Sequence, residues 1–115
     1  MVKLYKLEKV PSFKLFEGVK GRLIFGERMS LSFVEIEPNT TAPKHKHENE
    51  QITIAVEGNI TFTVGDKEYY MKKGDVIVFG SNEVHQGVAS EDGFQGIEIF
   101  APLRRDHLKL VQQNS

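Results

Sequence analysis

Short segments in which apolar and polar residues alternate follow one another along most of the chain, and turn-forming residues separate them. The segments with this pattern are 29–37, 51–56, 60–64, 84–90 and 94–100, and residues 76–79 form a short apolar strand among them. Alternation over four to eight residues is typical of β-strands, and we expect turns at 57–59, 65–66 and 91–93. Many short strands at this spacing predict an all-β antiparallel sandwich or barrel. Only residues 103–112 have apolar residues near helical spacing, so we expect one short C-terminal helix.

The composition of the 115-residue chain narrows the classes of protein to which it can belong. This length predicts a single domain, residues 1–115, with one core. Cysteine is absent, which excludes a disulfide framework, a thiolate nucleophile and a cysteine-based zinc site. The formal net charge is −1 and no basic run occurs, so we expect no nucleic-acid partner. No apolar stretch is long enough to span a bilayer, and we expect a cytoplasmic protein without a membrane partner.

Three histidines and one glutamine form the most specific chemical pattern in the sequence. Alternate side chains of a strand share a face, so His45, His47 and Gln51 are expected to point the same way. The two histidines would lie about 6.6 Å apart, within reach of one ion at roughly 2.1 Å from each ring. His85 follows a turn, where a barrel could return it to the same interior. The fourth histidine, His107, lies in a charged segment and is expected at the surface.

These four residues could ligate one divalent transition metal, and Ni, Zn, Fe, Mn and Cu are all compatible with them. Because Gln51 is neutral, such a site would keep a net charge near +2, which favours Lewis-acid chemistry and anion binding. Two simpler interpretations remain open. Histidine pairs of the HxH type occur by chance in surface loops, and Gln51 could instead form hydrogen bonds inside a barrel.

The spacing of these residues resembles the two sequence motifs of the cupin superfamily. The first motif runs from a glycine through HxH and an acidic residue to a second glycine; it corresponds to residues 39–58. The second runs from a glycine through PxG and a histidine to an asparagine; it corresponds to residues 74–89. Every spacing and all three histidines are retained, but five positions differ: Asn39, Gln51, Gly80, Asn82 and Ala89. The resemblance implies a double-stranded β-helix, the jelly-roll barrel of cupins. Asparagine is the commonest non-glycine residue at positive φ, so its use at two glycine positions is a mild change.

A closer resemblance covers roughly residues 18–108. The runs 26–51, 56–76 and 98–108 are similar to small single-domain cupins of the pectin-degradation (KdgF) type. Members of that family linearise 4,5-unsaturated uronates released by polysaccharide lyases. The resemblance implies that Glu98 and Arg104 are catalytic and that Arg104 and Phe100 contact the substrate. This chain has Glu98 where such members usually have aspartate.

Two of these residues also have a purely structural interpretation. By strand parity Glu98 and Phe100 share one face, and the isoleucines beside them share the other. Glu98 either faces solvent or lies inside the barrel, where a carboxylate needs a function or a partner. Arg104 could be solvated at a helix start or could hold a substrate carboxylate, because guanidinium groups form bidentate pairs with planar anions.

A stripe of apolar residues indicates a subunit interface. Ile52, Ile54 and Val56 alternate with Gln51 and therefore face away from it, unless a bulge near Gln51 changes the side. A solvent-facing stripe of this kind is unusual for a monomer. We therefore expect a homodimer, in which the N-terminal segment 4–7 could add a strand to the partner.

The histidine pattern predicts a metal-dependent protein, and the resemblance implies an enzyme that opens the ring of a 4,5-unsaturated uronate, an anionic small-molecule substrate. Two alternatives of other classes remain open. One is a cupin that binds a ligand without catalysis, and the other is a metal-dependent dioxygenase. The fold alone does not distinguish among the three.

Overall fold

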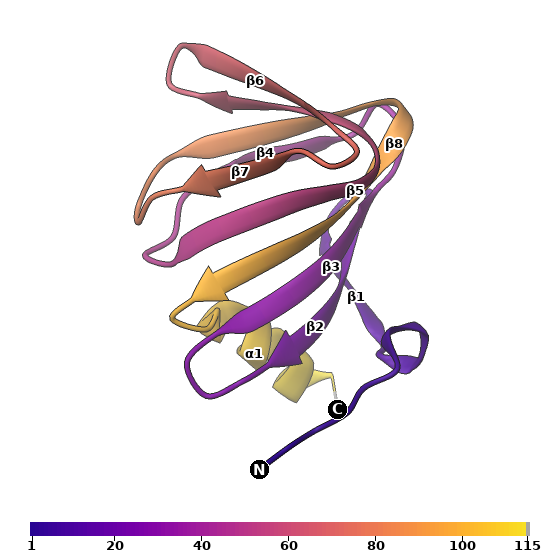
Figure 1. Ribbon diagram of the computed structural model, residues 1–115, viewed down its shortest axis with the longest axis vertical. Coiled ribbons are helices and arrows are strands. Elements are labelled where there is room, and N and C mark those ends of the chain that lie inside the picture. Colours follow the sequence, from indigo (N-terminus) through magenta and orange to yellow (C-terminus); the bar gives the residue numbers. More distant parts are fainter. Residues whose placement is uncertain (115) are drawn as a thin grey trace.

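The computed structural model describes residues 1–114 and consists mainly of antiparallel β-strands (Figure 1). A 3-10 turn, η1 (Leu7–Lys9), precedes them. The strands are β1 (Ser12–Phe16), β2 (Val19–Phe25), β3 (Ser30–Ile36), β4 (Thr41–His45), β5 (Glu50–Val64), β6 (Lys67–Lys72), β7 (Val76–Phe79) and β8 (His85–Ala101). The helix α1 (Arg105–Gln113) follows them, as the sequence predicts. Within the described residues, no helix has the length and apolar character needed to cross a membrane.

The strands form one network that folds into two layers. Neighbouring strands follow the order β1-β2-β3-β8-β5-β6, and β4 and β7 pair with the first halves of β8 and β5. β5 and β8 pair with each other over most of their length and pass through both layers. Figure 1 shows β2, β3, β8, β5 and β7 side by side, with β4 behind them. This arrangement confirms the predicted jelly-roll barrel.

The predicted turns at 57–59 and 91–93 are wrong, because β5 and β8 continue through both positions. The register of the β5–β8 pair instead shifts twice within this stretch. Gly58 has a φ of +74°, and a Cβ atom on it would lie 2.1 Å from the carbonyl oxygen of Gly93. The turn-forming residues therefore bend a continuous antiparallel pair of strands at β-bulges rather than end the strands.

The asparagines that replace two motif glycines have the backbone conformation that the motifs require. Asn39 has a φ of 56° and Asn82 a φ of 61°. Both lie in the left-handed region, which asparagine tolerates better than most non-glycine residues. The two turns that flank the histidines therefore keep their shape despite the substitutions.

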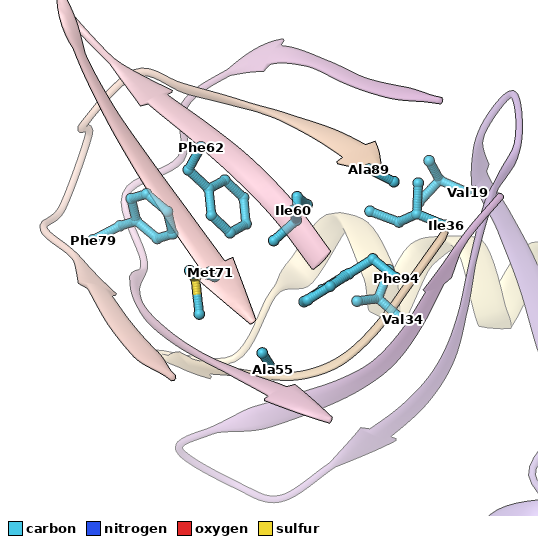
Figure 2. Close-up of a cluster of buried hydrophobic side chains, with 10 residues drawn as sticks. All are labelled: Val19, Val34, Ile36, Ala55, Ile60, Phe62, Met71, Phe79, Ala89 and Phe94. Carbon is cyan, nitrogen blue, oxygen red and sulfur yellow. The ribbon is translucent and has the colours of Figure 1, made fainter. Parts of the chain in front are cut away.

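A cluster of buried apolar side chains fills the space between the layers (Figure 2). Its members are Val19, Val34, Ile36, Ala55, Ile60, Phe62, Met71, Phe79, Ala89 and Phe94. Figure 2 shows Phe62, Phe79 and Met71 together at one end of the cluster, and the rings of Phe62 and Phe79 pack edge to face at 5.0 Å. The histidines lie next to this end, because the ring of His85 stacks on Phe79 at 4.3 Å.

The outer face of the barrel carries the apolar stripe that the sequence predicts. Gln51 is buried while Ile52 is 36% exposed, so the two face opposite ways. The register shift of β5 lies beyond Ala55 rather than near Gln51, and it leaves this assignment intact. The pairing places five apolar side chains in one row across five strands: Ile24, Leu31, Ile99, Ile52 and Val78. Nothing among the described residues covers the end of this row, where Val78 is 58% exposed.

Candidate functional site

The three motif histidines lie together inside one end of the barrel, although not in the way the sequence analysis expected. His45, His47 and Gln51 do not share one strand, because β4 ends at His45 and β5 begins at Glu50. The chain turns between the two strands, and this turn brings His47 back beside its neighbours. The cross-strand partner of His45 is His85, at the start of β8. One nitrogen atom from each of the three rings lies within 4.8 Å of the other two.

Each of these histidines is oriented by the backbone carbonyl of a nearby residue. The Nδ1 atoms of His45, His47 and His85 are 2.8, 3.0 and 2.8 Å from the carbonyl oxygens of Pro43, Asn49 and Glu83, respectively. A carbonyl oxygen only accepts, so Nδ1 carries the proton in all three rings. The Nε2 atoms therefore have free lone pairs when the rings are neutral, as metal ligation requires.

Burial keeps the two inner imidazoles neutral at pH 7. Burial lowers the pKa of His85 to about 4. Burial, and then the positive charge of Arg104, also lower the pKa of His47. The Nε2 atom of His85 is buried and has no hydrogen-bond partner among the described residues. A buried acceptor without a partner is costly, and a cation in the cluster would satisfy it.

Gln51 presents its amide oxygen to the histidines. Its Oε1 atom lies 3.0 Å from Nε2 of His47, while its Nε2 atom donates to Oγ1 of Thr53 at 2.8 Å and to Oε2 of Glu98 at 3.0 Å. A reversed amide would turn its oxygen toward a carboxylate. The Oε1 atom of Gln51 and the Nε2 atom of the neutral His47 ring are therefore both acceptors, and they face each other. A cation bound between them would remove this unfavourable contact. The donor set of three imidazole nitrogens and one amide oxygen thus fits a divalent transition metal.

Glu98 and Phe100 face the interior, which answers the question left open by strand parity. Phe100 is 1% exposed, and Glu98 lines the same cavity as His45, Gln51 and His85. Burial raises the pKa of Glu98 to about 7, against opposing contributions from Arg104, Thr53 and Gln51. A carboxyl group with such a pKa can donate or accept a proton near neutral pH.

Arg104 is buried at the same end of the barrel, and Asp106 already engages one edge of its guanidinium group. Its Nε and Nη2 atoms donate to the two carboxylate oxygens of Asp106 at 2.9 and 2.6 Å, which holds the pKa of Asp106 well below its usual range. The guanidinium lies over the Phe100 ring, 4.8 Å from its centroid. Among the described residues no hydrogen bond is found for Nη1, so that edge can receive an anion.

The prediction that His107 lies at the surface is wrong. Its side chain is buried, edge-on to the ring of Phe100 at 5.5 Å, and lines the cavity beside Glu98 and Arg104. Burial, then the charge of Arg104, lowers its pKa to about 4. The sequence spacing indicates this position, because His107 and Leu110 are three residues apart and therefore lie on the same face of α1. His107 is the residue of this helix that is buried.

Sequence reasoning also missed Asn49. Its side-chain amide donates to the carbonyl oxygens of Pro102 and Leu103, and its own carbonyl orients His47. Asn49 therefore ties the loop of the histidines to the segment that carries Arg104. No periodicity or motif spacing distinguishes such a residue from an ordinary loop asparagine.

The cavity beside the histidines is small, with a volume of about 40 Å³. Pockets for small molecules usually enclose about 300–1,000 Å³, so this space suits an ion or a few water molecules rather than a sugar ring. The half-exposed ring of Phe16, from β1, lies 5.7 Å from the ring of His45 at the mouth of the cavity. A monosaccharide would bind only if side chains at this mouth moved outward.

Comparisons with known proteins show which sequences and folds this chain resembles. Residues 32–95 match the sequence profile of the cupin domain family. The chain is 26% identical over 103 residues to the pectin degradation protein KdgF of Dickeya dadantii (strain 3937), a match that covers 88% of this chain and 94% of that protein.

Two solved structures have the same fold. The structure of KdgF from a Halomonas species superposes with a TM-score of 0.85 at 19% identity, covering 93% of this chain and 99% of that one. An RmlC-like cupin from Shewanella frigidimarina NCIMB 400 gives the same TM-score and identity and is covered over 96% of its length. At this level of identity the likeness concerns the fold alone.

Proposed function

The chain belongs to the cupin domain family, and we propose that it is a metal-dependent enzyme acting on a small sugar acid. The observation that carries the proposal is one shared interior site. Three imidazole nitrogens lie within 4.8 Å of one another, and the Gln51 oxygen lies 3.0 Å from Nε2 of His47. The adjoining cavity contains a carboxyl group, Glu98, and a guanidinium group, Arg104. Similarity to the pectin degradation protein KdgF of Dickeya dadantii directs the choice of substrate toward 4,5-unsaturated uronates.

His45, His47, Gln51 and His85 would hold one divalent transition metal. When bound, the ion would supply Lewis-acid polarisation of a substrate oxygen or a water. Besides acting as a ligand, Gln51 would set the net charge of the site. Because its side chain is neutral, the site would keep a charge near +2, which attracts an anionic sugar more strongly than a site with an acidic fourth ligand.

The proposed reaction opens the ring of the unsaturated uronate, which is a vinyl ether. Protonated Glu98 donates a proton to C4, and the carboxylate that remains removes a proton from the water that adds at C5. The bond between C5 and the ring oxygen of the resulting hemiketal then breaks, which leaves a ketone at C5 and an aldehyde hydrate at C1. Loss of water from C1 gives the linear keto-aldehyde. A pKa of Glu98 near 7 suits both steps, because neither the acid nor the base form is scarce at neutral pH.

Arg104 would bind the carboxylate of the substrate through its free Nη1 edge. The pairing with Asp106 and the contact with Phe100 fix the guanidinium in one orientation, so less side-chain entropy is lost when an anion binds. Phe100 is 1% exposed and does not line the cavity, so it would contact the sugar only after the side chains that cover it moved.

Loss of the ultraviolet absorbance of the unsaturated uronate tests the proposal, because hydration at C5 removes the conjugated double bond. We expect metal-loaded protein to accelerate this loss, and chelated protein and the His47→Ala variant to give the spontaneous rate. If the loaded protein binds uronates but leaves the absorbance decay unchanged, a ligand-binding cupin without catalysis takes the place of the enzyme. Oxygen uptake with the same substrate would instead favour a dioxygenase.

We also propose that the protein forms a homodimer through the outer face of β2, β3, β8, β5 and β7. Its row of apolar side chains, from Ile24 to Val78, supports this assembly, as does a second row that includes Ile54, Val76 and Ile97. Sheets pack face to face with their strands nearly aligned, so one copy of this face matches another. The extended N-terminal residues Leu4 and Tyr5 are exposed next to it and would enlarge the contact.

A further inference from the structure

A triangle of polar side chains lies directly beside the three histidines. Its corners are Gln51, Thr53 and Glu98. The Gln51 Nε2 atom donates to Thr53 Oγ1 at 2.8 Å and to Glu98 Oε2 at 3.0 Å, and the Thr53 hydroxyl is close enough to the Glu98 carboxyl group to lower its pKa. Thr53 is completely buried, and in the register of the sheet it is the direct neighbour of Glu98.

Counting donors shows that this triangle has one consistent arrangement. The Gln51 amide has two N–H groups, and each has an acceptor in the triangle. The Thr53 oxygen accepts from Gln51, so its single hydrogen is free to donate to Glu98. Both N–H groups of Gln51 are thereby used on the side away from the histidines, and its oxygen is left pointing at His47.

We propose that Thr53 is a positioning residue that fixes the Gln51 amide so that its oxygen, not its nitrogen, faces the three histidines. The inference rests on the metal site of the proposed function. An amide can rotate by half a turn with little change of shape, and only its hydrogen bonds select the orientation. Glu98 alone accepts one of the two N–H groups, and without the Thr53 hydroxyl the second would be buried without a partner.

The same residue links the metal site to the proposed proton-transfer group. Gln51 holds Oε2 of Glu98, so Oε1 is the oxygen left without a hydrogen bond to Gln51. Because Thr53 accepts from the Gln51 amide, and the same amide donates to Glu98, Thr53 acts on the orientation of both Gln51 and the carboxyl group. Residues in contact with ligands in this way typically change metal affinity by about 10- to 100-fold when they are replaced.

The chain offers a closely matched control for this role. Ser32 is also completely buried and is also a direct cross-strand neighbour of Glu98, on the other side. Its hydroxyl has no hydrogen-bond partner among the described residues, and it takes no part in the triangle. Loss of a hydroxyl near Glu98 can therefore be separated from loss of the Thr53 hydrogen bonds.

The first test measures the affinity for Zn²⁺ by competition with a chromogenic chelator. Thr53→Val keeps the shape of the side chain, and we expect it to weaken binding about 10-fold. Thr53→Ser and Ser32→Ala should stay within about 2-fold of the wild type. In a Gln51→Glu background the two ligand oxygens are equivalent and nothing needs to be oriented, so the added Thr53→Val change should have an effect below about 2-fold. Wild-type affinity in Thr53→Val, or an equal loss in both backgrounds, overturns the inference.

A second measurement uses metal-free protein and does not depend on the proposed function. The side-chain NH2 signals of Gln51, assigned by their absence in Gln51→Glu, should exchange slowly with solvent in the wild type and in Ser32→Ala. They should exchange at least 10-fold faster in Thr53→Val. If the wild type binds no Zn²⁺, the proposed function fails while this measurement still decides the inference. Slow exchange in Thr53→Val would refute it.

Discussion

The Nε2 atom of His47 lies 3.0 Å from the amide oxygen of Gln51, so two hydrogen-bond acceptors face each other once the imidazole is neutral. Burial lowers the pKa of His47, which makes the neutral ring the dominant form at pH 7. The Nε2 atom of His85 nearby is buried without a partner. Both features are unfavourable in a site without a cation, and both are resolved by one ion.

We therefore expect purified protein to carry close to one first-row divalent ion per chain. Changing His47 to Ala should remove most of the metal, because it deletes one of three imidazole ligands. The fold should survive, since the apolar cluster around Ile60 and Phe94 does not include His47. Elemental analysis gives the metal content and circular dichroism checks the fold, with exposed Lys46→Ala as the control. Unchanged metal content in the His47 variant would refute the site.

Substitutions at Gln51 test whether its oxygen is a ligand. Gln51→Glu should bind Zn²⁺ with equal or higher affinity, because an anion replaces a dipole. Gln51→Leu should bind about 10-fold more weakly, since the side chain offers no donor atom. Competition with a chelator measures all three affinities. Equal values would show that Gln51 is only part of the barrel wall.

The kinetic roles of Glu98 and Arg104 predict different changes in the absorbance assay. Glu98→Gln should lower kcat by about 100-fold or more with little change in KM, as expected for a proton-transfer group. Arg104→Ala should mainly raise KM, because the substrate carboxylate is held similarly before and during the reaction. Arg105→Ala, at the exposed neighbour of Arg104, is the control and should match the wild type. The reverse pattern in the first two variants would exchange the assigned roles.

The raised pKa of Glu98 also predicts a pH dependence for the stability of metal-free protein. Its pKa is about 7 when folded and 4.5 as a model value, so the unfolded chain ionises first. The contribution of Glu98 to stability is therefore highest below pH 4.5 and is lost as the pH rises to 7. His85 and His107, with folded pKa values of about 4, act in the opposite direction.

A comparison of Glu98→Gln with the wild type isolates the carboxyl group, because the histidines are common to both. The unfolding free energy of the variant, relative to that of the wild type, should increase by about 2 kcal/mol from pH 5 to pH 8. The full pKa shift of Glu98 would give a larger change, but its side chain is only partly shielded from solvent. Denaturant unfolding in the presence of a chelator measures it. A constant difference between the proteins at both pH values would contradict the assignment.

The sequence predicts which side chains lie close together better than it predicts the path of the chain between them. Motif spacing identified the three histidines and Gln51, because the turns at Asn39 and Asn82 keep the conformation that the motif needs. The local sequence pattern predicts a turn at Gly58, where the structure has a β-bulge, because a glycine is equally compatible with both. Only the close approach of another strand decides between them.

Partners of the site residues were harder to predict, because they come from contacts distant in the sequence. Thr53 has the strand parity of Gln51, but nothing in the sequence indicates that Glu98 lies opposite it. Asp106 is two residues from Arg104, yet only the start of α1 brings the two charges together. The charge of its segment predicts a surface position for His107, whereas its helical spacing with Leu110 indicates the buried position that the structure shows.

The outer face of the barrel provides the last prediction. Exposed apolar side chains at Ile52 and Val78 belong to a row that crosses five strands, and a stable interface needs about 800 Å² from each partner. We expect light scattering to give twice the chain mass of 13.1 kDa. Ile52→Lys places a charge within the row and should yield monomers, because an unpaired charge is costly in an apolar interface. Tyr70→Lys, on β6 and outside this row, should remain dimeric. A monomeric wild type, or an unaffected Ile52→Lys, would rule out this face as the contact.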